Sequence, residues 1–153
     1  MNEHQENLLK EEYFFLQQAY EDFDRRALLI KGWSVTLSLG GIAIAFQEES
    51  IQILILSGLV ALLFWVLEAM WKFFQYCNSV RIQEIESYFR GEIDSLTPLQ
   101  AYSTWFEAFQ NSKSWSREIA ANMMLGPVVI PHAPAVIVVI GLTILHSLSN
   151  GVF

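Results

Sequence analysis

Glu68 is the residue best placed to do chemistry, because it is the only acidic residue inside a long apolar stretch. A carboxylate that leaves water for lipid loses its hydration, so it needs a partner and is a candidate functional group. Lys72 follows Glu68 by one helical turn, and Lys31 is expected at nearly the same depth on a neighbouring helix. Glu68 and these lysines are therefore either a gate or intramembrane ion pair, or a pin that joins two helices at the membrane boundary.

The rest of the sequence offers no second chemical constellation. The spacing of His4, His132 and His146 resembles no zinc or haem pattern, and Cys77 is the single cysteine. His132 and His146 stand at opposite ends of one apolar stretch, and we interpret them as structural. No serine lies in a nucleophile elbow, and no His-Glu zinc motif occurs. We therefore expect no enzymatic activity, no catalytic residue, no metal and no cofactor.

Three long apolar stretches must position Glu68. Residues 28–46, 51–70 and 128–148 each approach the roughly 20 residues that a helix needs to cross about 30 Å of hydrocarbon. Hydrophobic residues make up 53% of the chain and charged residues only 16%, a balance typical of a membrane protein. Lipid offers no water to unpaired amides, and no alternating strand pattern occurs. We therefore predict transmembrane helices over residues 28–46, 51–74 and 126–148.

The basic residues predict the orientation of these helices. Four precede or begin the first span and five lie between the second and third, whereas residues 47–50 and those after 148 have none. They are Lys10, Arg25, Arg26, Lys31, Lys72, Arg81, Arg90, Lys113 and Arg117. By the positive-inside rule the N-terminus is cytoplasmic and the C-terminus lies outside. The stretch before the first span is acidic, so no cleaved signal peptide is expected, and the net charge of −7 argues against nucleic acid as a partner.

Apolar residues also recur outside the predicted spans, in a heptad seam with alternating spacings of four and three. The seam consists of Leu9, Tyr13, Leu16, Tyr20 and Phe23 before the first span, and of Ile82, Ile85 and Phe89 after the second. No Pro or Gly interrupts the first part, so one helix is expected to continue into the membrane, and Gly91 is a stop signal for the second. The seam predicts packing inside a helical hairpin, with subunit assembly as the alternative.

A tight turn at residues 47–50 would place the two seams side by side and bring small residues of the two spans to the same depth. These small residues are Ser34, Ser38, Gly40 and Gly41 in the first span, and Ser57 and Gly58 in the second. Small residues let the backbones of two transmembrane helices approach closely. We interpret the stripe as a helix contact, with the lining of a narrow pore in an oligomer as the alternative.

The segment between the second and third spans leaves alternatives open. Residues 95–98 predict a helix start with Pro98 in the first turn, followed by an apolar stripe of Leu99, Tyr102, Phe106 and Phe109. This helix could lie on the cytoplasmic leaflet or pack against the seam. Pro131 and Pro134 permit a kink in the third span, or a helix that begins only at Pro134.

Residues 6–90 resemble the SLATT arrangement of bacterial two-span membrane proteins, with a cytoplasmic amphipathic helix, two spans joined by a short turn and a long returning helix. The run FDRRALLIKGWSV at residues 23–35 is similar to one in small uncharacterised bacterial inner-membrane proteins. The resemblance implies a membrane effector that oligomerises and breaches the membrane in nucleotide-signalled anti-phage conflict systems. The third apolar segment departs from that arrangement.

These patterns predict an all-α membrane protein: a transmembrane helical hairpin with cytoplasmic coiled-coil-like extensions plus a third transmembrane helix. We expect one membrane domain over residues 1–153, with cytoplasmic helices over 1–28 and 75–125, in a bacterial inner membrane. The leading hypothesis is a homo-oligomeric effector or channel-like protein that perturbs the membrane on a signal. The alternative is a non-catalytic anchor or scaffold that docks a cytoplasmic protein partner through its helical stalk.

Overall fold

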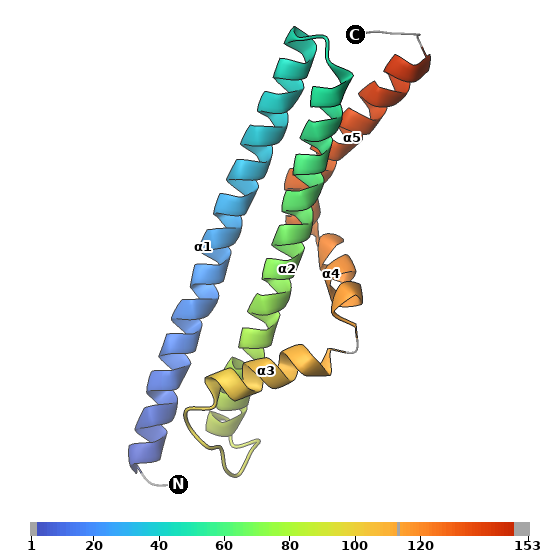
Figure 1. Ribbon diagram of the computed structural model, residues 1–153. Helices are drawn as coiled ribbons and strands as arrows, with labels where there is room; N and C mark the ends of the chain where they lie inside the picture. Colours follow the sequence, from blue (N-terminus) through green and yellow to red (C-terminus); the bar gives the residue numbers. More distant parts are fainter. Residues whose placement is uncertain (1–2, 113, 149–153) are drawn as a thin grey trace. The chain divides into compact units, whose positions relative to one another are not determined.

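The computed structural model describes residues 3–112 and 114–148, and the only regular secondary structure in these ranges is helical. The helices are α1 (Glu3–Gln47), α2 (Ile51–Phe89), α3 (Ala101–Asn111), α4 (Trp115–Met123) and α5 (Gly126–Leu148) (Figure 1). The predicted all-α fold class is confirmed. Lys113 and the residues after Leu148, which contributed to the topology prediction, lie outside the described residues.

The helices α1, α2 and α5 are long and apolar enough to cross a membrane, judged by length and composition. As predicted, α1 continues from the seam into the first span without a break, and α2 continues from the second span into the seam. α5 contains both Pro131 and Pro134, so the alternative in which the helix begins only at Pro134 is wrong. The chain thus has the helices of a multi-pass membrane protein, and their orientation stays a prediction.

Gly91 ends α2 in the way that the sequence predicts. Its φ of 76° lies in the left-handed region, which glycine enters without a steric penalty. The Gly91 amide donates to the Tyr88 carbonyl and the Glu92 amide to the Ser87 carbonyl, both at 2.9 Å. These two bonds form a Schellman motif, which pairs carbonyls that the helix end would otherwise leave free.

The chain divides into two compact units, which we describe separately. Unit 1 consists of Met1–Arg26 and Trp71–Glu118, and unit 2 of Ala27–Met70 and Ile119–Phe153. Each unit contains one part of α1 and one part of α2, while α3 belongs to unit 1 and α5 to unit 2. The residues of the heptad seam therefore fall in unit 1, and Glu68 and the small residues fall in unit 2.

The core of unit 1 is formed by the heptad seam. Leu9 and Leu16 of α1 pack with Ile82 and Ile85 of α2, and all four are buried. Tyr13 and Tyr20 cover this cluster as partly buried side chains. The seam therefore packs α1 against α2 within unit 1, which is the first of the two predicted alternatives.

The two ends of the predicted seam differ from its centre. Phe23 packs its ring against Trp71, with 5.0 Å between the ring centroids. Phe89 at the end of α2 is 46% exposed and does not belong to the buried cluster. The apolar contact between α1 and α2 in unit 1 is thus densest around Leu16 and Ile85.

A buried ion pair lies beside this core. Arg81 is 2% exposed and donates from Nε and Nη2 to the two carboxylate oxygens of Glu12, at 3.0 and 3.1 Å. Arg81 Nη1 also donates to Glu84 at 3.0 Å, and Nη2 donates to the Thr97 carbonyl at 2.7 Å. Burial alone would lower the pKa of Arg81, but its hydrogen bonds to Glu12 and Glu84 outweigh this effect and raise the pKa. The guanidinium therefore stays charged and fixes α1, α2 and the segment before α3 to one another.

Glu12 also decides where α3 begins. Its carboxylate accepts the backbone amides of Leu99 and Gln100, at 2.7 and 3.1 Å. Leu99 adopts a φ of 64°, a left-handed conformation that is uncommon for a residue with a side chain. The prediction of a helix start at residues 95–98 is wrong: α3 begins at Ala101, because the preceding amides bind Glu12.

The helix α3 packs against α2 within unit 1, which is one of the two predicted alternatives. Phe109 contacts the rings of Phe73 and Phe74, and the Trp105 indole donates to the Phe74 carbonyl at 3.3 Å. The predicted stripe was partly wrong, since Tyr102 and Phe106 are exposed and stack on each other. Trp105 occupies the contact face in their place.

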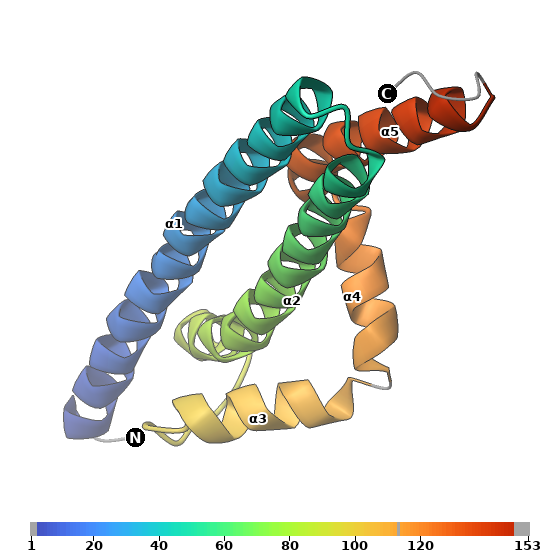
Figure 2. The ribbon, with the colours of Figure 1, turned by 45° about the horizontal axis from the view of Figure 1, so that its top comes forward.

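In unit 2, α5 lies beside the parts of α1 and α2 that belong to the same unit (Figure 2). Gly41 of α1 lies against Ser57 of α2, so closely that an added Cβ would collide with the Ser57 hydroxyl. Gly58 lies against Val139 of α5, and a Cβ there would be 2.7 Å from Val139 Cγ1. A side chain at either glycine would force Ser57 or Val139 to shift, so glycine favours the close helix approach at both contacts.

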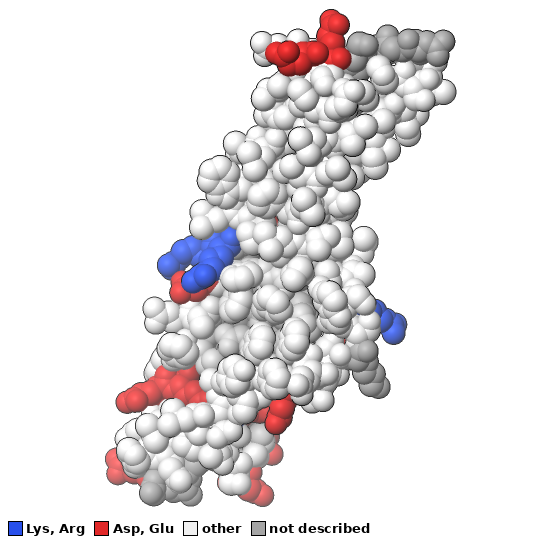
Figure 3. All heavy atoms as spheres, in the orientation of Figure 1, with Lys and Arg blue, Asp and Glu red and all other residues white. Residues whose placement is uncertain are grey.

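The outside of unit 2 is apolar. Large aliphatic and aromatic side chains are exposed along all three of its long helix segments: Leu28, Leu29, Trp33, Leu37, Leu39, Leu56, Leu59, Leu63, Ile130, Ile137, Ile140 and Ile144. Figure 3 shows that the face drawn has almost no charged atoms over this part of the molecule, with acidic atoms at its turn. A continuous apolar surface of this kind is suited to contact with lipid chains.

Leu16→Asp is expected to destabilise unit 1 strongly, because Leu16 is 2% exposed in the core. The unpaired buried charge and the lost leucine should lower the free energy of unfolding by at least about 3 kcal/mol. Phe15→Asp is the matched control, since Phe15 is the next residue and is 67% exposed. Thermal unfolding of the detergent-purified protein, followed by circular dichroism, measures both variants. Equal melting temperatures for the two would contradict the place of Leu16 in the core.

Candidate functional site

Four polar side chains from three helices form a continuous chain inside unit 2. Lys31 Nζ of α1 lies 3.2 Å from Glu68 Oε1 of α2, and Glu68 Oε2 lies 2.8 Å from His132 Nε2 of α5. His132 Nδ1 lies 2.7 Å from the hydroxyl of Ser34, which returns the chain to α1. Glu68 is thus bonded on one side to a cation and on the other to an imidazole.

Three of the four side chains in this group are buried, and the fourth, Lys31, is partly exposed. His132, Ser34 and Glu68 are 0%, 1% and 2% exposed, respectively, whereas the Lys31 side chain is 25% exposed. An ionised carboxylate buried to this degree is stable only with a charged or strongly hydrogen-bonding partner. Lys31 and His132 supply those partners, and the site is least buried on the Lys31 side.

The sequence brings these residues together through helix periodicity and packing. Lys31 and Ser34 are three residues apart and therefore share a face of α1. His132 lies between Pro131 and Pro134, which lack the amide hydrogens that would continue the helical bonding of α5. The packing of Val139 against Gly58 holds α5 close to α2, and Val139 is two helical turns from His132.

Two protonation states of His132 fit this geometry. In the neutral ring with its proton on Nε2, Nε2 donates to the Glu68 carboxylate and Nδ1 accepts the Ser34 hydroxyl. In the protonated ring both nitrogens donate, and the oxygen of Ser34 becomes an acceptor. Protonation therefore reverses one hydrogen bond and requires no movement of heavy atoms.

Ser34, His132 and Glu68 have the residue types of a hydrolytic triad but not its arrangement. In that triad the serine binds Nε2 and the carboxylate binds Nδ1. Here Ser34 binds Nδ1 and Glu68 binds Nε2. Ser34 also lies inside α1, where the amides are engaged in helix bonds and are not directed at an oxyanion. The arrangement therefore differs from that triad in the ring nitrogen that each partner binds.

Polar groups continue beyond Ser34 along the same face of α1. Ser38, four residues further, is fully buried, and its hydroxyl has no hydrogen-bond partner among the described residues. Ser57, which lies against Gly41, is also buried and donates to the Ile53 carbonyl at 2.8 Å. Lys31, Ser34 and Ser38 together with Ser57 form what we call the polar column of unit 2.

An apolar cluster follows the polar column. Ala45, Leu54 and Val139 are buried together, one from each of the three long helices. Ile42, Ile51, Ile53 and Leu142 pack around them. This cluster lies further along α1 than Ser38 and Gly41, on the side of the α1–α2 turn. These side chains pack as an apolar core in which no polar group of the column takes part.

The two lysines predicted around Glu68 have different partners within their own units. Lys31 lies beside Glu68 in unit 2, whereas Lys72 belongs to unit 1 and binds Asp24 and Gln75 there, at 3.0 and 2.6 Å. Among the predicted small residues, Ser34, Gly41, Ser57 and Gly58 make helix contacts, whereas an added Cβ at Gly40 would meet nothing within 4 Å.

Sequence analysis missed His132. The residue was noted only as one of two histidines at opposite ends of an apolar stretch and was interpreted as structural. Its partners lie 64 and 98 residues away, so no local spacing links them. A signal was nevertheless available, because a histidine in an apolar helix needs two hydrogen-bond partners and Glu68 needed one more.

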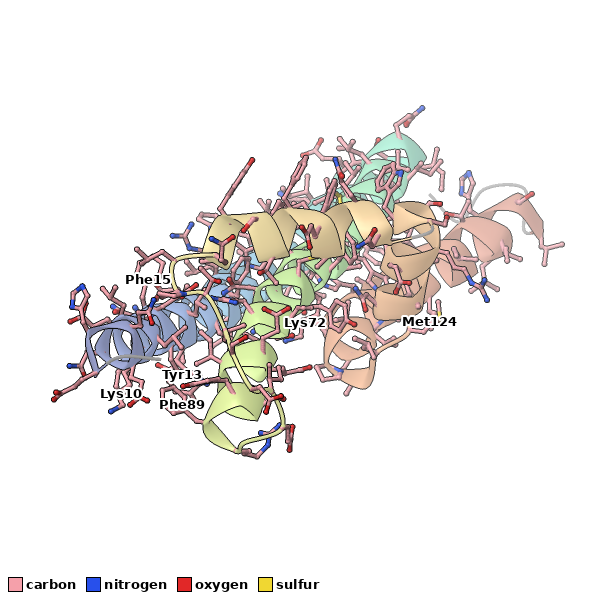
Figure 4. All side chains as sticks on the ribbon, turned by 90° about the horizontal axis from the view of Figure 1, so that it is seen from below. Lys10, Tyr13, Phe15, Lys72, Phe89 and Met124 are labelled. Atoms are coloured by element: carbon pink, nitrogen blue, oxygen red, sulfur yellow. The ribbon has the colours of Figure 1, made fainter. Side chains whose placement is uncertain are left out.

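Unit 1 contains a separate cavity of about 400 Å³, lined by Lys10, Tyr13, Phe14, Glu86, Phe89 and Arg90. Figure 4 shows Lys10, Tyr13 and Phe89 close together, where α1 and α2 lie side by side. The polar groups of this cavity bind one another or their neighbours: Tyr13 donates to Glu86 at 3.1 Å, and Arg90 pairs with Glu92 at 2.7 Å. The buried chain of unit 2 is therefore the stronger candidate site.

Ser34→Ala and Ser38→Ala should differ in stability although both remove a buried hydroxyl from α1. Ser34→Ala leaves His132 Nδ1 without its partner and should cost about 1–3 kcal/mol. Ser38→Ala removes an unpaired hydroxyl and should be neutral or stabilising. Melting temperatures in one detergent compare the two variants directly. A larger loss for Ser38→Ala would contradict the hydrogen bonding described here.

Comparison with known proteins adds no identity to this geometry. No protein-family model matches the chain, and neither the curated proteins nor the solved structures contain a significant match. The resemblance to the SLATT arrangement over residues 6–90 stays a prediction.

Proposed function

We propose that the chain is a channel-like membrane protein that lets small cations, protons included, cross a lipid bilayer through unit 2. The observation that supports this proposal is the buried chain Lys31–Glu68–His132–Ser34, which joins three helices suited to span a membrane. Ionisable side chains at such places are rare and commonly mark ion or proton pathways. The polar column extends this chain along α1.

The energetic cost of the site supports a functional role. Burying an ionised side chain inside a membrane-spanning unit is costly, and the cost rises with its depth from the membrane boundary. Well-packed apolar residues could join the same helices, often with equal or greater stability. A buried carboxylate bound to both an ammonium and an imidazole is therefore more than helix packing requires.

The arrangement corresponds to a closed state. Ala45, Leu54 and Val139 separate the polar column from the turn end of unit 2, and an apolar constriction blocks ions by excluding water. Opening would require the three helices to separate at this cluster. Gly58 and Val139 form a contact between α2 and α5 that such a movement would break.

The membrane orientation is proposed from the distribution of Lys and Arg, and the oligomeric effector role from the resemblance to the SLATT arrangement. The distribution of Lys and Arg favours a cytoplasmic N-terminus in a bacterial inner membrane, with unit 1 in the cytoplasm. Unit 1 would then receive the signal of an effector, and several copies, each with its own path through unit 2, would assemble in the membrane. The SLATT-like arrangement of residues 6–90 is the basis for this oligomeric effector role.

A scaffold that docks a cytoplasmic protein is the second candidate function. It is favoured by aromatic side chains exposed on unit 1, namely Phe14 and Phe15 on α1 and Tyr102 on α3. Exposed aromatic residues are enriched in protein interfaces. In this case the buried chain of unit 2 would hold three helices together and conduct nothing.

The proposed orientation is tested with reporters. A reporter fused after Phe153 should be exported, and one inserted near Asp94 should remain cytoplasmic, because Lys and Arg flank the first and second spans on one side only. Alkaline phosphatase and green fluorescent protein fusions report the two sides with opposite signals. Labelling of both positions from the same side would contradict a three-span topology.

The proposed conduction is tested by opening the apolar cluster. Leu54→Ser places a hydroxyl in the constriction and should raise cation flux from proteoliposomes, because water can then enter it. Leu56→Ser is the matched control, since Leu56 lies on the same helix and is 59% exposed. Glu68→Gln in the Leu54→Ser protein should lower the flux again. If monodisperse Leu54→Ser protein passes no cation, conduction is ruled out and the scaffold becomes the leading function.

A further inference from the structure

We propose that the species passed by the buried chain is the proton, and that His132 transfers it between Ser34 and Glu68. This inference rests on the proposed conduction through unit 2 and adds the identity of the ion. Its basis is that both ring nitrogens of His132 have a hydrogen-bond partner, Ser34 at 2.7 Å and Glu68 at 2.8 Å. Both distances are short enough for direct proton transfer.

The transfer balances without any redox step. A proton delivered by water reaches Ser34, and the Ser34 hydroxyl proton passes to His132 Nδ1, which produces an imidazolium. The imidazolium then releases its Nε2 proton to Glu68 Oε2, which produces a neutral carboxylic acid. Water at the Lys31 end takes this proton and restores the Glu68 carboxylate. The ring is then the Nδ1–H tautomer, with Nδ1 donating to Ser34. A reorientation of the imidazole that restores the Nε2–H donor to Glu68 must follow before the next proton can pass, so each proton passed requires one such reset.

The charged groups around His132 stabilise the charged species that this proton transfer produces. Glu68 faces the ring from α2, Ser34 faces it from α1, and Lys31 reaches the far oxygen of Glu68 from α1. The carboxylate stabilises the imidazolium, while Lys31 stabilises the carboxylate after the proton has left. His132 is therefore charged only transiently, and the Glu68 carboxylate, itself stabilised by Lys31, balances that charge.

A metal cation is a poor fit for the same site. Conduction of a dehydrated cation needs a ring of oxygen ligands that replace its hydration shell. Here the nearest groups to the Glu68 carboxylate are an ammonium at 3.2 Å and an imidazole at 2.8 Å. The ammonium of Lys31 already occupies a cation position on Glu68 and would repel a second cation. Among the described residues no group of three or more His, Cys, Asp or Glu side chains is placed to hold a metal.

Ser38 gives the proton a route towards Ser34. It lies one helical turn from Ser34, is fully buried and has a hydroxyl without a partner among the described residues. A buried hydroxyl of this kind is available to bind a water molecule that would link it to Ser34. The apolar cluster of Ala45, Leu54 and Val139 lies beyond it and would stop proton movement in the closed state.

The test uses the full-length protein in liposomes that contain a pH-sensitive dye. A potassium gradient with valinomycin sets the membrane potential, and proton, sodium and potassium fluxes are measured for the wild type and for Leu54→Ser. We expect Leu54→Ser to pass protons and to exclude sodium and potassium. His132→Gln in this background should reduce proton flux at least about tenfold, because glutamine cannot take up and release a proton. His146→Gln, at the other end of α5, is the matched control and should leave the flux unchanged.

Ser34→Ala provides a second variant that retains both His132 and Glu68. It should also reduce proton flux, since it removes the donor to Nδ1. Sodium or potassium flux through Leu54→Ser comparable to its proton flux would overturn the proton inference and leave conduction standing. Proton flux that survives both His132→Gln and Ser34→Ala would overturn the role of His132. Absence of every flux from folded Leu54→Ser would overturn conduction itself.

Discussion

The burial of the Glu68 carboxylate is the constraint on which unit 2 depends. A carboxylate that is 2% exposed cannot remain charged without partners, and its two oxygens bind Lys31 of α1 and His132 of α5. Glu68 therefore connects all three long helices of the unit at one point. The apolar contacts elsewhere in unit 2 fix how closely these helices pack, but they do not select a register as strongly as a charge that must find two specific partners.

Unit 1 uses a buried charge differently. Glu12 binds Arg81 with both oxygens and also accepts the amides of Leu99 and Gln100. The Arg81 guanidinium donates four hydrogen bonds, its pKa is raised, and it stays charged. In unit 2, by contrast, His132 links Ser34 to Glu68 through its two ring nitrogens. A buried, compensated charge is thus held by a guanidinium in unit 1 and by an ammonium and an imidazole in unit 2.

Features of the protein that repeat along the sequence could be predicted from it. Features that depend on one contact between residues far apart in the sequence could not. The heptad spacing predicted the Leu9, Leu16, Ile82 and Ile85 core, and helix length and composition predicted three candidate spans. The start of α3 was wrong because Glu12, remote in sequence, binds the amides before it. His132 was missed for the same reason, since its place beside Glu68 depends on how α5 packs, which no periodicity in α5 encodes.

The small residues explain why the buried chain can form at all. Ser34, Gly41 and Ala45 lie on one face of α1, and the contact of Gly41 with Ser57 brings α1 and α2 close enough for Lys31 to reach Glu68. Gly58 does the same for α5, since a side chain at this position would push Val139 away and His132 with it. Hydrogen bonds of 2.7–2.8 Å tolerate little displacement. Within unit 2 the small residues of this stripe thus make helix contacts that bring the polar groups of the site together, and its predicted role in lining a path in an oligomer stays a prediction.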